Sequence, residues 1–381
     1  MPSKPLFTTH FLTITDPRID RQKAHLLIDI IMVAICAVIC GADSWIDIAD
    51  FGEAKEQWLK TFLALPNGIP SHDTFGRVFS LLDPAQFQAS FAGWIQSVVE
   101  LTRGQVIAID GKTNRRTGGT DKDGVVIRPL HLVSAWATAN GVALGQVATD
   151  QKSNEITAIP ELLKLLDISG CLITTDAMGC QSDIAADIVA RGGDYLLAVK
   201  DNQGLLYRSM KKVFADANMP KTTNTTEDIG HGRIEKRVCA VMTGEAVMTH
   251  LDHKNNWVSL NTIVKVSAER TTQKTGVVSK QSRYYICSRE DPSAESMQAA
   301  VRAHWGVENS LHWVLDMAMR EDESRIRKDH APANMAVLRH IALNIVKGDT
   351  SRKVGIKASR LKAGWDSAYL QKLLGIERGG F

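Results

Sequence analysis

The 381-residue sequence lacks the short motifs that define several common enzyme sites. Its six cysteines form no CxxC pair and no Cys/His spacing typical of zinc ligands, and there is no HExxH motif, so a zinc site is not expected. No GxGxxG or P-loop sequence follows a strand-like run. That absence argues against a doubly wound phosphatase or a nucleotide-cofactor enzyme.

The chain also has little that indicates a membrane or an oxidising compartment. Its apolar run Ile30–Ala42 is too short to span a bilayer and lies between Asp29 and Asp43. The first residues do not join a basic segment to an apolar one, so no signal peptide is expected. Cys36 and Cys40 are four residues apart in an apolar helical pattern and are expected to pack as reduced thiols. We therefore expect a cytoplasmic protein that does not enter a membrane.

The whole chain has little net charge, but the charges of each sign are unevenly distributed along it. The net charge is only +3. Residues 1–104 carry 8 basic and 11 acidic residues, whereas residues 325–381 carry 12 basic and 4 acidic ones. Such a local excess favours a polyanionic partner, although a solvated helical tail would have the same composition.

Changes in hydrophobic period divide the chain into five parts. Residues 1–104 predict a small all-α domain, and residues 105–200 predict the first part of an α/β core. Residues 201–292 are rich in strand signals and predict an inserted β subdomain. Helical spacing returns in residues 293–346, the second part of the core, and residues 347–381 predict a basic helical tail.

Two predicted strands each end on an aspartate. Gln105–Lys112 is a short apolar run in which Asp110 is followed by Gly111, a residue that allows a turn. Residues 171–176 have the same form and deliver Asp176. The predicted order, a three-stranded antiparallel meander followed by parallel strands, can place the first and fourth strands side by side. The two carboxylates would then meet and could hold a hard cation.

A third acidic ligand is predicted on the helix that contains Glu308. At about 100° per residue, this glutamate lies at the edge of the apolar stripe that would pack on the sheet. The stripe consists of Val307, Leu311, Val314 and Ala318. Asp316 falls on the opposite side, and Glu321 and Glu323 are expected to be solvated charges. His304 and His312 could support a ligand or contact DNA phosphate as readily as they could bind metal.

The chain resembles the H-repeat-associated group of bacterial insertion-sequence transposases, which belong to the DDE class. The resemblance extends over nearly the whole length. It rests on these blocks: Ile35–Ile39 with Gly41 and Ala42, Gly68–Thr74, Ile107–Thr113, Lys152–Leu162, Thr174–Gln181, Asp194–Lys200 with Asn202 and Gln203, His231–Glu235, His304 with Trp305, Glu308 with Asn309, and Leu311–Trp313.

This resemblance implies a ribonuclease-H-like mixed-sheet core with an all-α N-terminal domain and a β-rich insertion. The DDE triad falls on Asp110, Asp176 and Glu308. Related insertion-sequence transposases carry a lysine after the glutamate, but Leu315 stands at that position here. The role of the lysine would then be absent or would fall to another residue, such as His312 or Arg320.

The expected chemistry is cleavage of DNA at the ends of an element and joining of the freed 3′-hydroxyl to target DNA. The triad would hold two Mg²⁺ ions, or Mn²⁺ as a substitute, with Asp110 bridging them. The expected partners are double-stranded DNA, as terminal inverted repeats and as target, and a second copy of the chain in a homodimer. Bound to DNA, the protein would associate with the bacterial nucleoid.

Several residues outside the triad are candidates for contact with DNA: Lys112, Lys200, His231, Arg233, Arg302, Trp305 and His312. Two other functions stay open. One is a metal-dependent nuclease that cuts without joining. The other is a transposase-derived DNA-binding protein that no longer catalyses.

Overall fold

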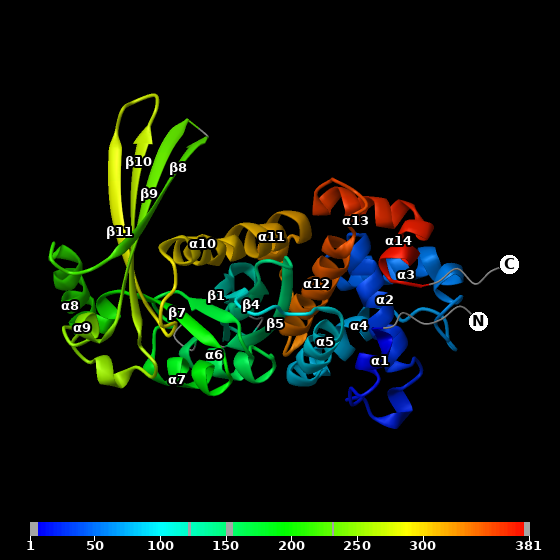
Figure 1. Ribbon diagram of the computed structural model, residues 1–381. Coiled ribbons are helices and arrows are strands. Elements are labelled where there is room, and N and C mark those ends of the chain that lie inside the picture. Colours follow the sequence, from blue (N-terminus) through cyan, green and yellow to red (C-terminus); the bar gives the residue numbers. More distant parts are fainter. Residues whose placement is uncertain (1–6, 121–122, 150–154, 231, 377–381) are drawn as a thin grey trace.

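A mixed sheet and a helical region lie end to end in the computed structural model, which describes residues 7–120, 123–149, 155–230 and 232–376 (Figure 1). The long sheet contains nine of the strands, in the order β5-β4-β1-β6-β7-β11-β10-β9-β8. Helices α6 and α7 lie on one face of it, and α10 and α11 lie on the other (Figure 1). The α/β class expected from the sequence is confirmed.

The first helices form a compact region with well-defined ends. Gly41 ends the second of them at φ 117, and Ser44, Ser71 and Asp83 cap the next three with side-chain oxygens. The helices are α1 (Thr8–Phe11), α2 (Leu27–Cys40), α3 (Trp45–Leu59), α4 (His72–Leu81) and α5 (Pro84–Val98). Within the described ranges no single helix is long and apolar enough to cross a bilayer. The pair α2 and α3 passes that test only together, at a bend of 97°.

The sheet has the strand order that the sequence predicted for its first half. Strands β1, β4 and β5 form an antiparallel meander, and β6 and β7 add to β1 in parallel. The first and fourth strands of the prediction, β1 and β6, are therefore neighbours, as a ribonuclease-H-like core requires. The strands are β1 (Val106–Asn114), β4 (Leu130–Ala137), β5 (Val142–Thr149), β6 (Leu172–Thr175) and β7 (Asp194–Val199), with the short pair β2 (Gly119–Thr120) and β3 (Val126–Ile127) beside them. Helices α6 (Glu155–Lys164) and α7 (Ser182–Ala190) connect the parallel strands.

The β-rich segment after β7 extends the same sheet. Strand β11 pairs antiparallel with β7, and β10, β9 and β8 follow in turn. In Figure 1 these four strands rise from the sheet as an arm. They are β8 (Thr222–Gly230), β9 (Arg233–Thr243), β10 (Thr262–Thr272) and β11 (Val278–Cys287), accompanied by helices α8 (Gly204–Ala215) and α9 (Glu245–Met248).

The C-terminal helices share a core with the N-terminal ones. Helix α12 (Ala331–Gly348) is buried along most of its length and packs against α2, α4 and α5. Helices α13 (Ile356–Trp365) and α14 (Ser367–Leu373) complete this region, and Arg360 of α13 is only 5% exposed. Its guanidinium donates hydrogen bonds to the Val38 carbonyl at 2.8 and 3.2 Å and to the Ala318 carbonyl. Helices α13 and α14 therefore pack on the helical region through Arg360 and their apolar side chains.

We predict that Arg360→Met lowers the free energy of unfolding by about 3 kcal/mol or more, because buried carbonyl groups lose their donor. Thermal and urea denaturation followed by circular dichroism would measure this. Lys357→Met on the exposed side of the same helix is the control and should change stability by no more than about 0.5 kcal/mol. Equal effects of the two substitutions would contradict the assignment of Arg360 as an anchor.

Candidate active site

Asp110 lies inside strand β1 rather than at its end. The strand continues to Asn114, because Asp110 pairs with Ser134 and Gly111 with Val133 of β4. The parallel pairing with β6 nevertheless stops at Ile109 and Thr175. The two strands part at this point, and the aspartates that follow, Asp110 and Asp176, stand on either side of the opening.

Gly111 is required for a close approach and not for the turn that the sequence suggested. A Cβ at this position would lie 2.4 Å from Glu155 Oε1 and 2.7 Å from His131 Nε2. His131 Nε2 and Glu155 Oε1 are 2.8 Å apart, and His131 Nδ1 is 2.8 Å from Thr113 Oγ1. This buried pair, which sequence reasoning missed, lies directly against the backbone next to Asp110.

Asp176 is oriented by the loop that follows β6. Its Oδ1 accepts hydrogen bonds from the backbone N–H of Met178 at 2.8 Å and of Gly179 at 3.4 Å. The same loop is fastened by Asn202, whose side chain donates to the Ala177 carbonyl at 2.6 Å. Asp176 lines one cavity of about 460 Å³ together with Asp110 and Glu308.

Glu308 opens a π-helical turn, Glu308–His312, between α10 (Ala294–His304) and α11 (Trp313–Met319). Bonding from i to i+5 lowers the rotation per residue, so residues four apart stay on one face. The buried residues are therefore Val307, Leu311, Leu315 and Met319, and the predicted stripe through Val314 and Ala318 is wrong. His312 and Asp316, placed further out by the straight wheel, turn toward the sheet.

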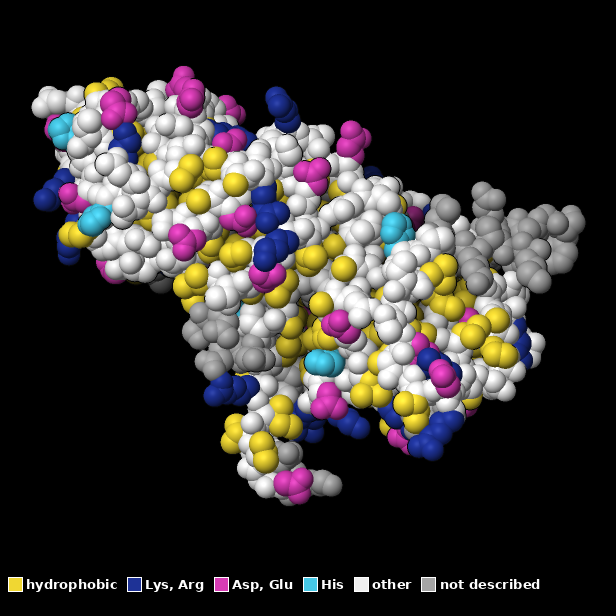
Figure 2. Space-filling model, turned by 90° about the horizontal axis from the view of Figure 1, so that it is seen from below, with side chains coloured by type: hydrophobic (Ala, Val, Ile, Leu, Met, Phe, Trp, Pro, Cys, Tyr) yellow, Lys and Arg dark blue, Asp and Glu magenta, His cyan; other side chains and the backbone are white. Residues whose placement is uncertain are grey.

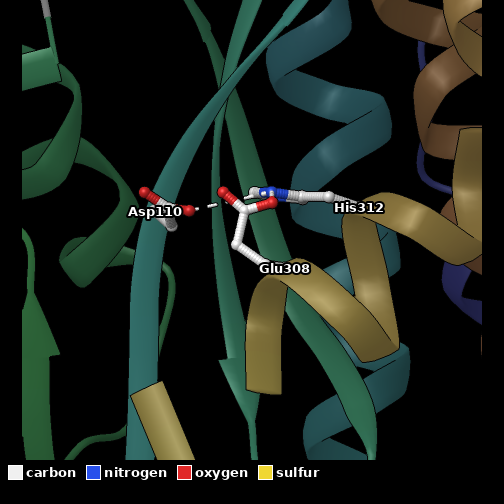
Figure 3. A group of neighbouring side chains, drawn as sticks. All are labelled: Asp110, Glu308 and His312. Atoms are coloured by element: carbon white, nitrogen blue, oxygen red, sulfur yellow. Dashed lines mark ion pairs between the residues drawn. The ribbon is translucent and has the colours of Figure 1, made fainter. Parts of the chain in front are cut away.

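Three of the side chains converge closely, as Figure 3 shows. His312 Nδ1 lies 3.5 Å from Glu308 Oε2 and 3.7 Å from Asp110 Oδ2. Each of the three residues offers a ligand atom within 4.8 Å of the others. Asp176 is not a member of this tight group, although it faces the same cavity.

The carboxylates of Asp110, Glu308 and Asp176 lie close enough to repel one another. Burial is the main reason that the pKa of Asp110 rises to about 6; the carboxylates of Glu308 and Asp176 add to the rise, and His312 opposes it. The pKa of Glu308 is lowered, chiefly by its interaction with His312. Oxygen-rich, negatively charged and partly buried, the group fits a divalent cation, which would relieve this repulsion.

Lys112 clamps the strand of Asp110 to the helix of Glu308. Its Nζ lies 2.7 Å from Glu321 Oε2 and also pairs with Asp316. Glu321 is fully buried, so the prediction of a solvated charge is wrong there; Glu323 is exposed, as predicted. Burial alone would raise the pKa of Glu321, but Lys112 and Arg339 outweigh it and lower the pKa to about 2.

The other DNA-contact candidates are spread around the cavity. Lys200 is exposed and lines it. Arg302 pairs with Asp228 of β8 at 2.8 Å, and Trp305 is 44% exposed beneath the guanidinium of Arg283 at 4.3 Å. Arg233 is exposed at the start of β9, far along the arm (Figure 1). His231 lies outside the described residues.

His312 and Arg320, the two residues considered for the role of the lysine that Leu315 replaces, lie in different surroundings. Leu315 is buried in the core, His312 stands beside the acids, and Arg320 pairs instead with Glu323 at 2.6 Å. A different lysine reaches the π turn: Lys347 of α12 donates to the Ser310 carbonyl at 3.0 Å and lies over the ring of Trp136. No local sequence signal connects residues 310 and 347.

Figure 2 shows the charged side chains on one face of the molecule. That view from below has Lys and Arg side chains in several groups, separated by apolar and acidic ones. Positive charge therefore does not form one continuous surface on this side of the molecule.

Two neighbouring strands of a mixed sheet and one helical segment thus bring three acids to a single cavity, a set of ligands that suits a divalent cation. Comparison with protein-family models agrees. Residues 102–345 match the model described as "Transposase DDE domain", and residues 8–95 match "DDE_Tnp_1-associated". The chain belongs to the DDE transposase family.

Similar proteins carry the same description. The chain is 42% identical over 365 residues to "Putative transposase YncI" of Escherichia coli O157:H7, covering 95% of this chain and 92% of that protein. It is 42% identical over 374 residues to "H repeat-associated putative transposase YhhI" of Escherichia coli K12, covering 96% of both. Among solved structures, a piggyBac transposase synaptic complex with hairpin DNA is 10% identical, with a TM-score of 0.40, over 99% of this chain and 83% of that one. That likeness is too weak to define a fold.

We predict that Glu321→Gln destabilises the protein by about 3–5 kcal/mol, because Lys112 and Arg339 lose a buried counter-charge. Glu323→Gln, exposed two residues away, is the matched control.

Glu321→Gln should also change how the stability of the protein depends on pH. A carboxyl whose pKa is lowered by folding stabilises the protein above its unfolded pKa, and that contribution is lost as the pH falls toward the folded value. The wild type should therefore lose more stability than Glu321→Gln between about pH 5 and pH 2. Denaturant unfolding at several pH values would test this, and parallel curves would contradict it.

Proposed function

We propose that this protein is an active DDE transposase, which cuts DNA at the ends of an insertion sequence and joins the 3′-hydroxyl to target DNA. The observation that supports it is the meeting of acids from three distant segments, Asp110, Asp176 and Glu308, around one cavity. Asp110 and Glu308 also share a group suited to a metal ion. All three acids are present, which speaks against a catalytically silent descendant.

The proposed metal ligands are Asp110, Asp176 and Glu308, and the proposed ion is Mg²⁺, with Mn²⁺ as a substitute. Such an ion supplies charge stabilisation at the phosphate oxygens and makes the attacking oxygen a better nucleophile. The chain provides the placement. Backbone N–H groups fix Asp176, the π turn turns Glu308 toward β1, and the Lys112 clamp holds the two elements in register.

The DNA strand is proposed to enter along the exposed rim of the cavity. Lys200 and Trp305 lie at this rim, and Arg302 lies one helical turn from Trp305. Their charges and ring suit phosphate contact and base stacking. Lys112 is proposed to hold β1 against the helix of Glu308 and not to contact phosphate, because two carboxylates already hold its ammonium group. Arg233 on the arm is proposed to touch DNA further from the cut, and His231, which lies outside the described residues, is proposed from the sequence alone to contact DNA.

Terminal inverted repeats and target DNA are the proposed partners, with two copies of the chain in the working complex. The proposed division of labour follows five segments: residues 1–104, 105–200, 201–292, 293–346 and 347–381. The second and fourth carry the triad, and the others are proposed to hold DNA ends in place. A bound chain would be found with the nucleoid.

We predict that Asp110→Asn and Glu308→Gln each lower Mg²⁺-dependent nicking by at least about 100-fold, because loss of a direct metal ligand costs more than loss of a supporting residue. The substrate is a DNA duplex carrying the element's own ends, and products are resolved on a denaturing gel. Glu323→Gln, an exposed glutamate away from the cavity, is the control. Undiminished nicking by either triad variant would refute the assignment.

A second assay separates the proposed function from its two alternatives. A supercoiled target plasmid is added to the nicked ends, and joined products are scored. Transposase activity predicts joining that both triad substitutions abolish. Nicking without joining would identify a nuclease, and specific binding of the end duplex without nicking would identify a DNA-binding protein.

A further inference from the structure

We propose that His312 is a direct nitrogen ligand of the divalent ion held by Asp110 and Glu308, and that it biases this position toward Mn²⁺. The inference rests on the proposed function, because it assumes that the acidic cavity binds metal. It adds an imidazole nitrogen to the three carboxylates that are the proposed metal ligands.

The π turn places the imidazole where a ligand would have to be. His312 is four residues after Glu308, and the widened turn keeps both on the face that meets β1. Only 5% of His312 is exposed. Figure 3 shows its ring extending toward the space between the carboxyl groups of Asp110 and Glu308.

The distances suit a shared ion better than a hydrogen bond. His312 Nδ1 is 3.5 Å from Glu308 Oε2 and 3.7 Å from Asp110 Oδ2, whereas an N–H···O bond is usually 2.7–3.2 Å long. Two ligands at about 2.1 Å from one octahedral ion are about 3 Å apart. A small inward movement of each side chain would therefore complete the coordination.

The ring has no other polar contact that explains its inward position. Among the described residues, His312 Nε2 is buried and has no hydrogen-bond partner. An ion at Nδ1 would not satisfy Nε2; the observation leaves Nδ1 as the ring nitrogen that faces the carboxylates of Asp110 and Glu308. The other histidine of the cavity differs: His304 Nδ1 is 3.0 Å from Thr174 Oγ1, so that nitrogen is already engaged.

A nitrogen ligand changes which ions the position favours. Mg²⁺ strongly prefers oxygen ligands and retains its waters, whereas imidazole raises affinity for transition ions, among which Mn²⁺ is the one closest to Mg²⁺ in its preference for oxygen ligands. We therefore expect the dissociation constant for Mn²⁺ to be at least about tenfold lower than that for Mg²⁺. Part of this difference should be lost when His312 is replaced.

The test uses the full-length protein with Mn²⁺ alone as the probe. Binding is measured from the loss of the free-ion electron paramagnetic resonance signal, and pulsed measurements then detect magnetic nuclei bonded to the ion. We expect ¹⁴N coupling in the wild type, replaced by ¹⁵N coupling when histidine is labelled. His312→Gln should lose this coupling and bind Mn²⁺ at least about tenfold more weakly, whereas His304→Gln should keep the coupling. Thermal melting confirms that each variant is folded.

Three results would overturn the inference: bound Mn²⁺ without nitrogen coupling, coupling that survives in His312→Gln, or no binding at millimolar Mn²⁺. None of them decides the proposed function, which stands or falls with nicking and joining in Mg²⁺. Loss of nicking in Asp110→Asn together with an all-oxygen Mn²⁺ spectrum would keep the transposase and remove His312 from the metal.

Discussion

The buried pairing of Lys112 with Asp316 and Glu321 is the interaction on which the active-site geometry depends. Lys112 is two residues from Asp110 on the same strand, and Asp316 is one turn beyond His312 on the helix of Glu308. The relative position of Asp110 and Glu308, two of the proposed metal ligands, is therefore set by charges just behind them. Because Glu321 is fully buried and Lys112 largely so, removal of either one leaves a buried charge uncompensated.

Helix α12 connects the Lys112–Glu321 pair and the π turn to the helical region. Arg339 of this helix lies close enough to Glu321 to lower its pKa, and Lys347 near its end donates to the π turn at Ser310. Helix α12 packs against α2, α4 and α5, while Arg360 of α13 bridges α2 and α11. The N-terminal helices are therefore joined to the helical segment of Glu308 by packed and charged contacts, although the two are more than 200 residues apart in the chain.

Much of the core could be predicted from the sequence because it depends on local patterns. Apolar runs located β1 and β6, and the order of strands made them neighbours. Two of the wrong predictions concern residues whose partners are distant in the sequence, and a third concerns the geometry of a helix. The sequence predicts a turn at Gly111 because Glu155, which occupies the space where a Cβ would lie, is 44 residues away. It predicts a solvated Glu321 because Lys112 is 209 residues away. The π turn was missed because a wheel of fixed rotation has no place for one.

The arm of strands β8–β11 has a mechanical consequence. It is joined to the core by a continuous ladder, in which Tyr284 of β11 pairs with Val199 of β7, and Lys200 follows at the rim of the cavity. The arm and the rim of the cavity thus share one twisted, hydrogen-bonded sheet. Any change in how β11 pairs with β7 would alter the backbone next to Lys200.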